Sequence, residues 1–152
     1  APTYEQTKIG GDIVSTVLLD LTALKNKSDD GDVIGLASGA AYFAKYKTGT
    51  MGILYKVEMS CLELPTASSN VGLDFDIFAD SNATRAYDYD ISGADTTFTG
   101  GGNFALNQTI QMLNPTATAD DYFYLTTGAT HTGDSDHTAG KLMIKFYGHA
   151  TF

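Results

Sequence analysis

Met-Gly-Ile-Leu-Tyr-Lys-Val-Glu-Met-Ser-Cys-Leu, residues 51–62, is the stretch that decides the fold of this chain. The odd-numbered positions from 53 to 61 are apolar: Ile53, Tyr55, Val57, Met59 and Cys61. The even-numbered positions carry the polar residues Lys56, Glu58 and Ser60, between Leu54 and Leu62. A period of two is typical of a half-buried strand, so this stretch predicts a strand whose apolar face other strands must cover.

The size and composition of the chain indicate a single globular domain. It has 152 residues, 43% of them hydrophobic and 18% charged, and a domain of this size buries roughly 68 to 70% of its unfolded surface. No run of about 18 apolar residues is present to span a bilayer. The net charge of −9 would repel phosphate backbones and anionic lipids. We therefore expect a soluble protein whose partners include no nucleic acid and no membrane.

The single cysteine, Cys61, excludes an internal disulfide framework. Its place on an apolar strand face predicts a small buried hydrophobic side chain, because a reactive thiol needs a neighbouring base or cation. The first residues, Ala-Pro-Thr-Tyr, lack the charged and hydrophobic regions of a signal peptide. Synthesis in a cytoplasm is the expectation that follows.

The polar residues 1–11 end in two glycines and predict an N-terminal arm that leads into a single domain of residues 12–152. Arms of this composition usually fray, so an ordered one would be held by its own domain or by a neighbouring subunit. Residues 12–21 fit either a helix capped by Asp12 or an alternating strand. Their β-branched residues favour the strand.

Alternation along the chain predicts further strands at 41–47, 71–78, 85–91 and 141–147. We also expect strands at 33–36 and 122–127. Residues 104–113 fit a helix or a strand, since their apolar spacing suits both. Residues 96–103 contain three consecutive glycines and predict a mobile loop.

Strands that follow one another in the sequence are expected to pair as hairpins. We expect residues 41–47 to form a hairpin with 51–62, and 122–127 to form one with 141–147 across a long polar loop. Many short strands with turn signals between them predict an all-β fold, an antiparallel β-sandwich. We prefer a jelly-roll-like arrangement to an immunoglobulin-like one, because the chain has no Cys-Trp-Cys signature and no tryptophan.

The most chemical-looking segment is residues 131–137, His-Thr-Gly-Asp-Ser-Asp-His, which brings together two imidazoles and two carboxylates. These are possible metal ligands, but a zinc site needs further ligands from elsewhere in the fold. Polar hairpin tips are also built from these residue types. We therefore favour a solvated loop for His131, Asp134, Asp136 and His137 and assign no metal ligand.

A group of acidic residues in the middle of the chain could bind calcium through carboxylate oxygens. It consists of Asp74, Asp76, Asp80, Asn82, Asp88, Asp90 and Asp95. Pairing of strands 71–78 and 85–91 would gather four carboxylates, and a glycosidase would also require a carboxylate pair. The spacing does not match an EF-hand loop, so the interpretation that we favour is the solvated face of a sheet.

No sequence motif indicates an enzyme: a Walker loop, a G-x-S-x-G elbow, H-E-x-x-H and C-x-x-C are all missing. Gly100, Gly101, Gly102 and Asn103 lack the lysine and the strand-to-helix context of a phosphate loop. Six tyrosines could stack on sugars or cover a subunit contact: Tyr42, Tyr46, Tyr87, Tyr89, Tyr122 and Tyr124. We assign no catalytic residue and no cofactor.

Three segments resemble small virion structural proteins of tailed marine bacteriophages. They are 7–13, Thr-Lys-Ile-Gly-Gly-Asp-Ile; 122–128, Tyr-Phe-Tyr-Leu-Thr-Thr-Gly; and 139–148, Ala-Gly-Lys-Leu-Met-Ile-Lys-Phe-Tyr-Gly. Such proteins are similar to capsid cement or decoration proteins, so the resemblance implies a non-enzymatic protein on the capsid surface of a virion. It implies the major capsid protein and copies of the chain itself as partners. It carries over no functional residue.

This expectation agrees with the charge, because an acidic protein would not compete for packaged DNA. In this hypothesis the arm of residues 1–11 reaches onto a neighbour, and the loops around Gly100 and Gly133 face solvent or contact the coat. The alternative is a carbohydrate-binding, lectin-like module of a tail or fibre, because such a module would share the same sandwich.

Overall fold

The computed structural model describes residues 2–27, 29–69, 73–91, 95–100, 102–131 and 133–150. These ranges contain ten β-strands and one short helix. The strands are β1 (Thr3–Ile9), β2 (Asp12–Asp20), β3 (Lys25–Asn26), β4 (Ala44–Lys45), β5 (Ile53–Ala67), β6 (Phe75–Asp80), β7 (Asp95–Thr99), β8 (Thr109–Leu113), β9 (Tyr122–Thr127) and β10 (Ser135–His149), and the helix is α1 (Thr48–Met51).

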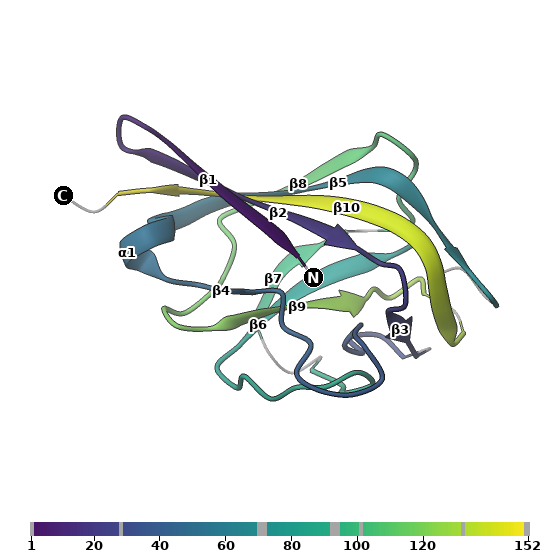
Figure 1. The fold of residues 1–152 in the computed structure, drawn as a ribbon. Coiled ribbons are helices and arrows are strands. Elements are labelled where there is room, and N and C mark those ends of the chain that lie inside the picture. The colour runs from purple at the N-terminus through teal and green to yellow at the C-terminus, as the bar shows by residue number, and fades with distance from the viewer. Residues whose placement is uncertain are drawn as a thin grey trace.

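The strands form two antiparallel sheets that pack against each other (Figure 1), which confirms the predicted all-β antiparallel sandwich. The first sheet has the order β1-β2-β10-β5-β8, and β3 pairs with the beginning of β10. The second sheet has the order β4-β9-β6-β7. Most connections cross from one sheet to the other, so strands that are neighbours in sequence are rarely neighbours in a sheet.

The stretch that predicted the fold lies in β5 from Ile53 onward, beside the central strand β10 of the first sheet. Its first residues are not strand, because Met51 ends α1 and Gly52 caps that helix. Its inward side chains are fully buried at Val57, Met59 and Cys61, as the alternation predicts. At its beginning the predicted face is wrong, because Leu54 is buried and Ile53 is 44% exposed. The register between β10 and β5 shifts between Tyr147 and Gly148. Such a bulge moves the following side chains to the opposite face.

The core lies between the sheets and joins residues from distant parts of the chain. Phe123 of β9 stacks on Phe146 of β10, with ring centroids 4.6 Å apart. Cys61 is completely buried, and this burial raises the pKa of its thiol. The predicted burial of Cys61 is confirmed, and a thiol held in its protonated form is a poor nucleophile.

The outer faces of the two sheets differ. Loops from residues 29–43 and 81–91 cover the outer face of the second sheet, where Val33 and Ile91 pack on Phe78 and Tyr124. In Figure 1 these loops lie below the second sheet, whereas no described segment lies over the outer face of the first sheet. One outer face is therefore buried and the other is open.

Several predicted strands are wrong or much shorter than expected. Residues 85–91 form turns, with one isolated bridge between Asp90 and Asp32, because they curve over the second sheet. Residues 33–36 form only isolated bridges, and only β4 is a strand within 41–47.

Other segments are more regular than expected. The predicted mobile loop at 96–103 contains most of β7. Residues 104–113 fitted a helix or a strand in sequence, and the structure forms the strand β8 at their end. The predicted strand 71–78 is observed as β6, from Phe75 onward. Val71 and Gly72 lie outside the described residues.

Both predicted hairpins are wrong. β4 pairs with β9 instead of β5, and β10 pairs with β2 and β5 instead of β9. The physical reason is that each of these connections crosses the core. Phe123 and Phe146, for example, meet face to face between the sheets instead of side by side within one sheet.

The N-terminal segment forms β1, which pairs along its whole length with β2. The turn between them uses Gly10, whose φ of 60° is readily adopted by glycine. Gln6 Nε2 donates hydrogen bonds to Ser15 Oγ at 3.1 Å and to the carbonyl of Thr50 at 2.7 Å. Its own domain therefore holds this ordered segment, and contact with a neighbour stays a prediction.

Candidate functional site

The histidine segment of residues 131–137 is divided between the interior and the surface. His131 and His137 are buried, at 5% and 2% exposure, so the predicted solvated loop is wrong for both. Asp134 and Asp136 point outward instead and form ion pairs with lysines 27 and 25 at 2.8 and 2.9 Å. The alternation of β10 separates His137 from Asp136, because Ser135 and His137 face inward while Asp136 faces solvent.

The two histidines belong to a buried polar cluster with Asn26 and Ser135. Asn26 Nδ2 lies 2.6 Å from His131 Nε2, and Asn26 of β3 is directly opposite Ser135 of β10. Burial lowers the pKa of both histidines, that of His137 to about 4. Within the described residues, both ring nitrogens of His137 and the Ser135 hydroxyl lack hydrogen-bond partners.

This cluster does not form a metal centre in the described part of the chain, where no three His, Cys, Asp or Glu side chains converge on a common point. The carboxylate that influences His131 most is Asp74, from the segment before β6, rather than a residue of the histidine segment. Asp74 Oδ2 accepts hydrogen bonds from Thr130, from its backbone N at 2.8 Å and from its Oγ1 at 2.7 Å.

The acidic residues do not gather as predicted. Asp74 and Asp76 are buried, so a solvated sheet face is the wrong interpretation for this pair. Burial raises the pKa of Asp76 to about 6, and its Oδ1 accepts a hydrogen bond from the backbone N of Gly100 at 2.7 Å. Asp88 lies on a turn and Asp90 in an isolated bridge, and both are exposed, so the predicted cluster of four carboxylates does not form.

The rest of the acidic group serves local structure. Asp80 pairs with Arg85 at 2.6 Å, and Asn82 Oδ1 accepts a hydrogen bond from the backbone N of Thr84 at 2.8 Å. The Asp95 side chain lies outside the described residues. Sequence reasoning missed Asp32, whose pKa is raised to about 6 by burial and by neighbouring carboxylates.

The glycine-rich segment has no room for a phosphate at Gly100. A side chain there would collide with the backbone carbonyl of Phe75, and its backbone N already donates to the carboxylate of Asp76. Gly101 lies outside the described residues. Close approach to β6 is therefore the structural reason for glycine at position 100.

Two of the candidate tyrosines are buried and cannot stack on a ligand. Tyr46 donates a hydrogen bond to the carbonyl of Gly52 at 3.0 Å, and Tyr124 donates one to the carbonyl of Asn82 at 2.6 Å. Tyr42 and Tyr89 are 43% and 42% exposed. Tyr87 is half-buried.

The exposed tyrosines have aromatic and cationic neighbours. Tyr42 meets Tyr122 edge to face with centroids 4.9 Å apart, and Lys45 Nζ lies 5.1 Å from the centroid of Tyr122. The guanidinium of Arg85 lies 4.0 Å from the centroid of Tyr89. These aromatic rings are therefore held in place on the surface, a property that suits contact with a partner.

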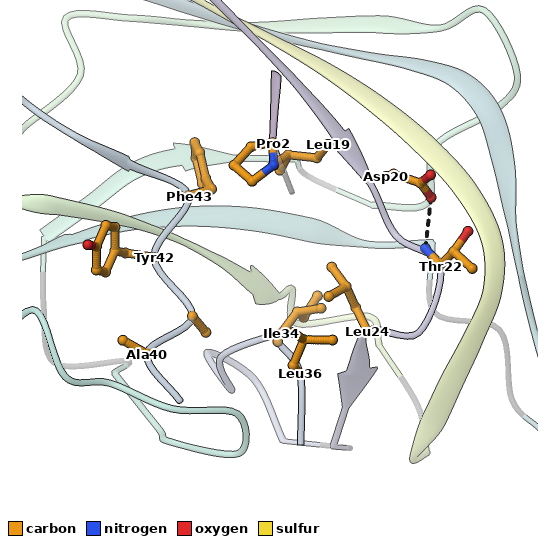
Figure 2. A pocket seen from close by; sticks show the side chains of 12 residues that line it. Pro2, Leu19, Asp20, Thr22, Leu24, Ile34, Leu36, Ala40, Tyr42 and Phe43 are labelled. Carbon is orange, nitrogen blue, oxygen red and sulfur yellow. Dashed lines mark hydrogen bonds between the residues drawn. The ribbon is translucent and has the colours of Figure 1, made fainter. Parts of the chain in front are cut away.

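An apolar pocket opens at the edge of the sandwich, between the end of β2 and the segment that leads to β4 (Figure 2). Its volume is about 200 Å³. Its walls are mainly apolar: Pro2, Leu19, Leu24, Ile34, Leu36 and Phe43. No sequence pattern predicted this pocket, because its walls come from separate segments that only the packing of the two sheets brings together.

The polar groups of the pocket are few. Asp20 Oδ1 accepts a hydrogen bond from the backbone N of Thr22 at 3.0 Å, and hydrogen bonding to Thr22 lowers the pKa of Asp20. Leu36, 56% exposed, and Tyr42 stand at the mouth. The pocket can therefore bury an apolar group from outside, with a single ionised carboxylate close by.

Comparison with protein-family models, with curated proteins and with solved structures found no match to this chain. The resemblance to phage virion proteins therefore stays a prediction. Among the described residues, no helix has the length and the apolar character to cross a membrane.

Proposed function

We propose that this chain is a capsid cement or decoration protein of a tailed bacteriophage, which lies on the capsid surface and stabilises the assembled coat without catalysing a reaction. The observation that carries the proposal is the apolar pocket with exposed Leu36 and Tyr42 at its mouth. In this proposal the pocket receives an apolar side chain of the major capsid protein.

The size of the pocket supports a protein partner over a small molecule. Its volume of about 200 Å³ is below the roughly 300 to 1,000 Å³ of small-molecule sites. A cavity of about 150 Å³ accommodates a benzene ring. One aromatic or leucine side chain would therefore fill the pocket, and buried anchors of this kind supply most of the energy of an interface.

A protein of this kind stabilises a shell by mass action. If it binds the assembled coat and not the free subunits, binding shifts the equilibrium toward the shell. The symmetry of the shell repeats the same contact many times. A modest affinity at each site then produces a large total stabilisation.

We also infer that the sandwich is a jelly roll. Without β1 and β3, each sheet has four strands, in the orders β2-β10-β5-β8 and β4-β9-β6-β7. This interleaved order supports two Greek keys wound around one core. Jelly rolls occur in viral capsid domains and in lectins, so the inference agrees with the proposed function and with its alternative.

The pocket can be tested by charging its mouth with Leu36→Glu. We expect the variant to bind particles that lack the protein at least tenfold more weakly than the wild type, because an ionised carboxylate cannot enter an apolar contact without a partner. The measurement is a co-sedimentation titration. Leu106→Glu is the matched control, since Leu106 is 50% exposed in a different loop. Equal binding of the two variants would remove the pocket from the proposal.

The exposed tyrosines favour one alternative function, carbohydrate binding by a tail or fibre module. Tyr42 and Tyr89 present ring surface to solvent, and aromatic faces are the usual platforms for sugars. A glycan array probed with the wild type and with Tyr42→Ala and Tyr89→Ala tests this function. Glycan binding that both substitutions abolish would favour it over the capsid role.

A further inference from the structure

The open face of the first sheet is a regular array of side chains. The pairing register aligns five rows across the strands. The rows are Ile9, Asp12, His149 and Ile53; Thr7, Val14, Tyr147, Lys56 and Leu113; Glu5, Thr16, Lys145, Glu58 and Gln111; Thr3, Leu18, Met143, Ser60 and Thr109; and Asp20, Lys141 and Glu63. The residues between these rows on β2 and β10 point into the core.

Apolar and aromatic side chains are spread over this face. Tyr147 of the central strand β10 lies opposite Val14 of β2, and Met143 lies opposite Leu18. Leu113, 61% exposed, adds apolar surface at the edge. Loops bury the outer face of the second sheet, but no described segment covers these residues.

Several of the polar side chains are held in fixed positions. Tyr147 donates a hydrogen bond to Glu58 at 2.7 Å, and Lys56 Nζ lies 3.0 Å from Glu58 and 3.9 Å from the centroid of Tyr147. Lys141 pairs with Glu63. Ordered side chains lose little entropy when a partner covers them.

The charge of the molecule is distributed unevenly. The five rows contain three lysines and five acidic residues, so the open face carries two of the nine excess negative charges, and the other seven lie elsewhere on the chain. If two copies met through this face, most of the negative charges that repel each other would lie away from the contact. Lys145 and Glu58 lie side by side in the middle row. A two-fold axis parallel to the strands, between β10 and β5, would place each Lys145 opposite Glu58 of the other copy.

The area of the face also suits a dimer. Five strands about 4.8 Å apart and nine residues of about 3.3 Å each describe a surface of roughly 700 Å². A standard stable interface buries about 600 to 1,000 Å² on each partner. The face is therefore large enough for a standard interface between two copies.

We propose that two copies of this chain pack through these open faces in a two-fold dimer. The contact is isologous, so the same rows of residues meet in both copies. Stacked sheets of this kind lie about 10 Å apart and interdigitate their side chains. The pocket proposed for the coat lies at the edge of the sandwich, and of the residues in the five rows it shares only Asp20.

Sedimentation equilibrium of the wild-type chain tests the dimer. The expected mass is twice the monomer mass of 16.2 kDa at micromolar concentration. Met143→Glu and Thr16→Glu each add a carboxylate to the open face, and we expect each to weaken dimerisation at least tenfold. Thr84→Glu is the control, because it adds the same charge at an exposed position in the loop over the second sheet.

Each possible result decides the proposal. A wild-type monomer would overturn it, and coat binding weakened by Met143→Glu would then assign the face to the coat. A dimer that both face variants leave intact would place the contact elsewhere and would also overturn it. Circular dichroism spectra and thermal melts identify a variant that fails to fold, and the second face variant then decides.

Discussion

At the scale of single residues, three buried ionisable side chains make the stability of this fold depend on pH in opposite directions. Asp32 and Asp76 have pKa values raised from 3.8 to about 6, because burial disfavours their charged form. His137 has a pKa lowered from 6.5 to about 4 for the same reason. The two aspartates therefore reduce stability as the pH rises from 3.8 to 6, and the histidine reduces it as the pH falls from 6.5 to 4.

Asp76→Asn should stabilise the protein at neutral pH. The amide keeps an oxygen to accept the hydrogen bond from Gly100 but carries no charge to bury. We expect a gain of about 1 to 2 kcal/mol in the free energy of unfolding at pH 7, and little gain below pH 3.8, where the aspartate is protonated in both states.

Urea denaturation at the two pH values measures this gain. Asp12→Asn is the control, since Asp12 is exposed at the beginning of β2 and its substitution relieves no buried charge. If Asp76→Asn had the same effect on stability at both pH values, burial of its charge would not be the cause.

His137→Leu should remove the acid sensitivity that comes from the buried polar cluster. At pH 7 we expect the variant to gain about 1 kcal/mol, because two ring nitrogens that have no hydrogen-bond partner among the described residues are replaced by apolar atoms beside Phe75. The gain should grow to about 2 to 3 kcal/mol near pH 4, where the unfolded wild type binds a proton that the buried ring resists. Denaturation curves from pH 7 to pH 4 measure the difference, and a constant difference would show that His137 does not titrate on unfolding.

At the scale of elements, the pairing of β10 with β5 builds the first sheet, and two glycines allow it to bend at one end. A Cβ atom at Gly148 would collide with the backbone carbonyl of Met51, and one at Gly52 would collide with the backbone of His149. The bulge at this point lets α1 pack against the end of β10 and turns Ile53 outward. Glycine is therefore required by close backbone contact at this end of the paired region.

Gly148→Ala should strongly destabilise the protein. The added methyl group must displace the backbone of Met51, and we expect a loss of about 2 to 4 kcal/mol or failure to fold. Gly49→Ala is the matched control, because a Cβ at Gly49 in α1 meets no atom within 4 Å. It should be neutral or slightly stabilising, since alanine favours a helix over glycine. Thermal melts of both variants distinguish a local collision from a general intolerance of alanine for glycine, and equal melts would contradict the collision.

At the scale of the whole molecule, three surfaces serve different contacts in our account. The second sheet is covered by its own loops, the first sheet is open, and the apolar pocket lies at the edge between them. The excess negative charge lies mainly away from the open sheet. This arrangement suits a protein that binds its own copy on one face, the coat at one edge, and solvent elsewhere.

The capsid proposal predicts a defined copy number. In purified particles, quantitative mass spectrometry should find this chain at a simple fraction of the amount of the major coat protein, because each binding site repeats with the symmetry of the shell. A few copies per particle would instead favour the tail or fibre alternative. Absence from particles would rule out both.

Local sequence determined the strands whose side chains alternate between core and solvent. β2, the inward side of β5 and the later part of β10 follow from a period of two, because each of these strands has one face in the core and a simple pattern of pairing. The burial of Cys61 follows from the same pattern. The all-β sandwich could therefore be predicted from residues that lie close together in the chain.

Tertiary structure alone decided which strands pair, which polar residues are buried, and where the pocket lies. The polar segment with His131 and His137 looks solvated in sequence, yet both histidines are buried. His137 faces inward on β10, and Asn26 of β3 contacts His131. Asp74 and Asp76 are buried for a similar reason, under segments that follow β7 and β9. The pocket depends on segments as distant as Pro2 and Phe43. Contacts between residues far apart in the chain leave no local period in the sequence, and for this reason only the packed sheets reveal them.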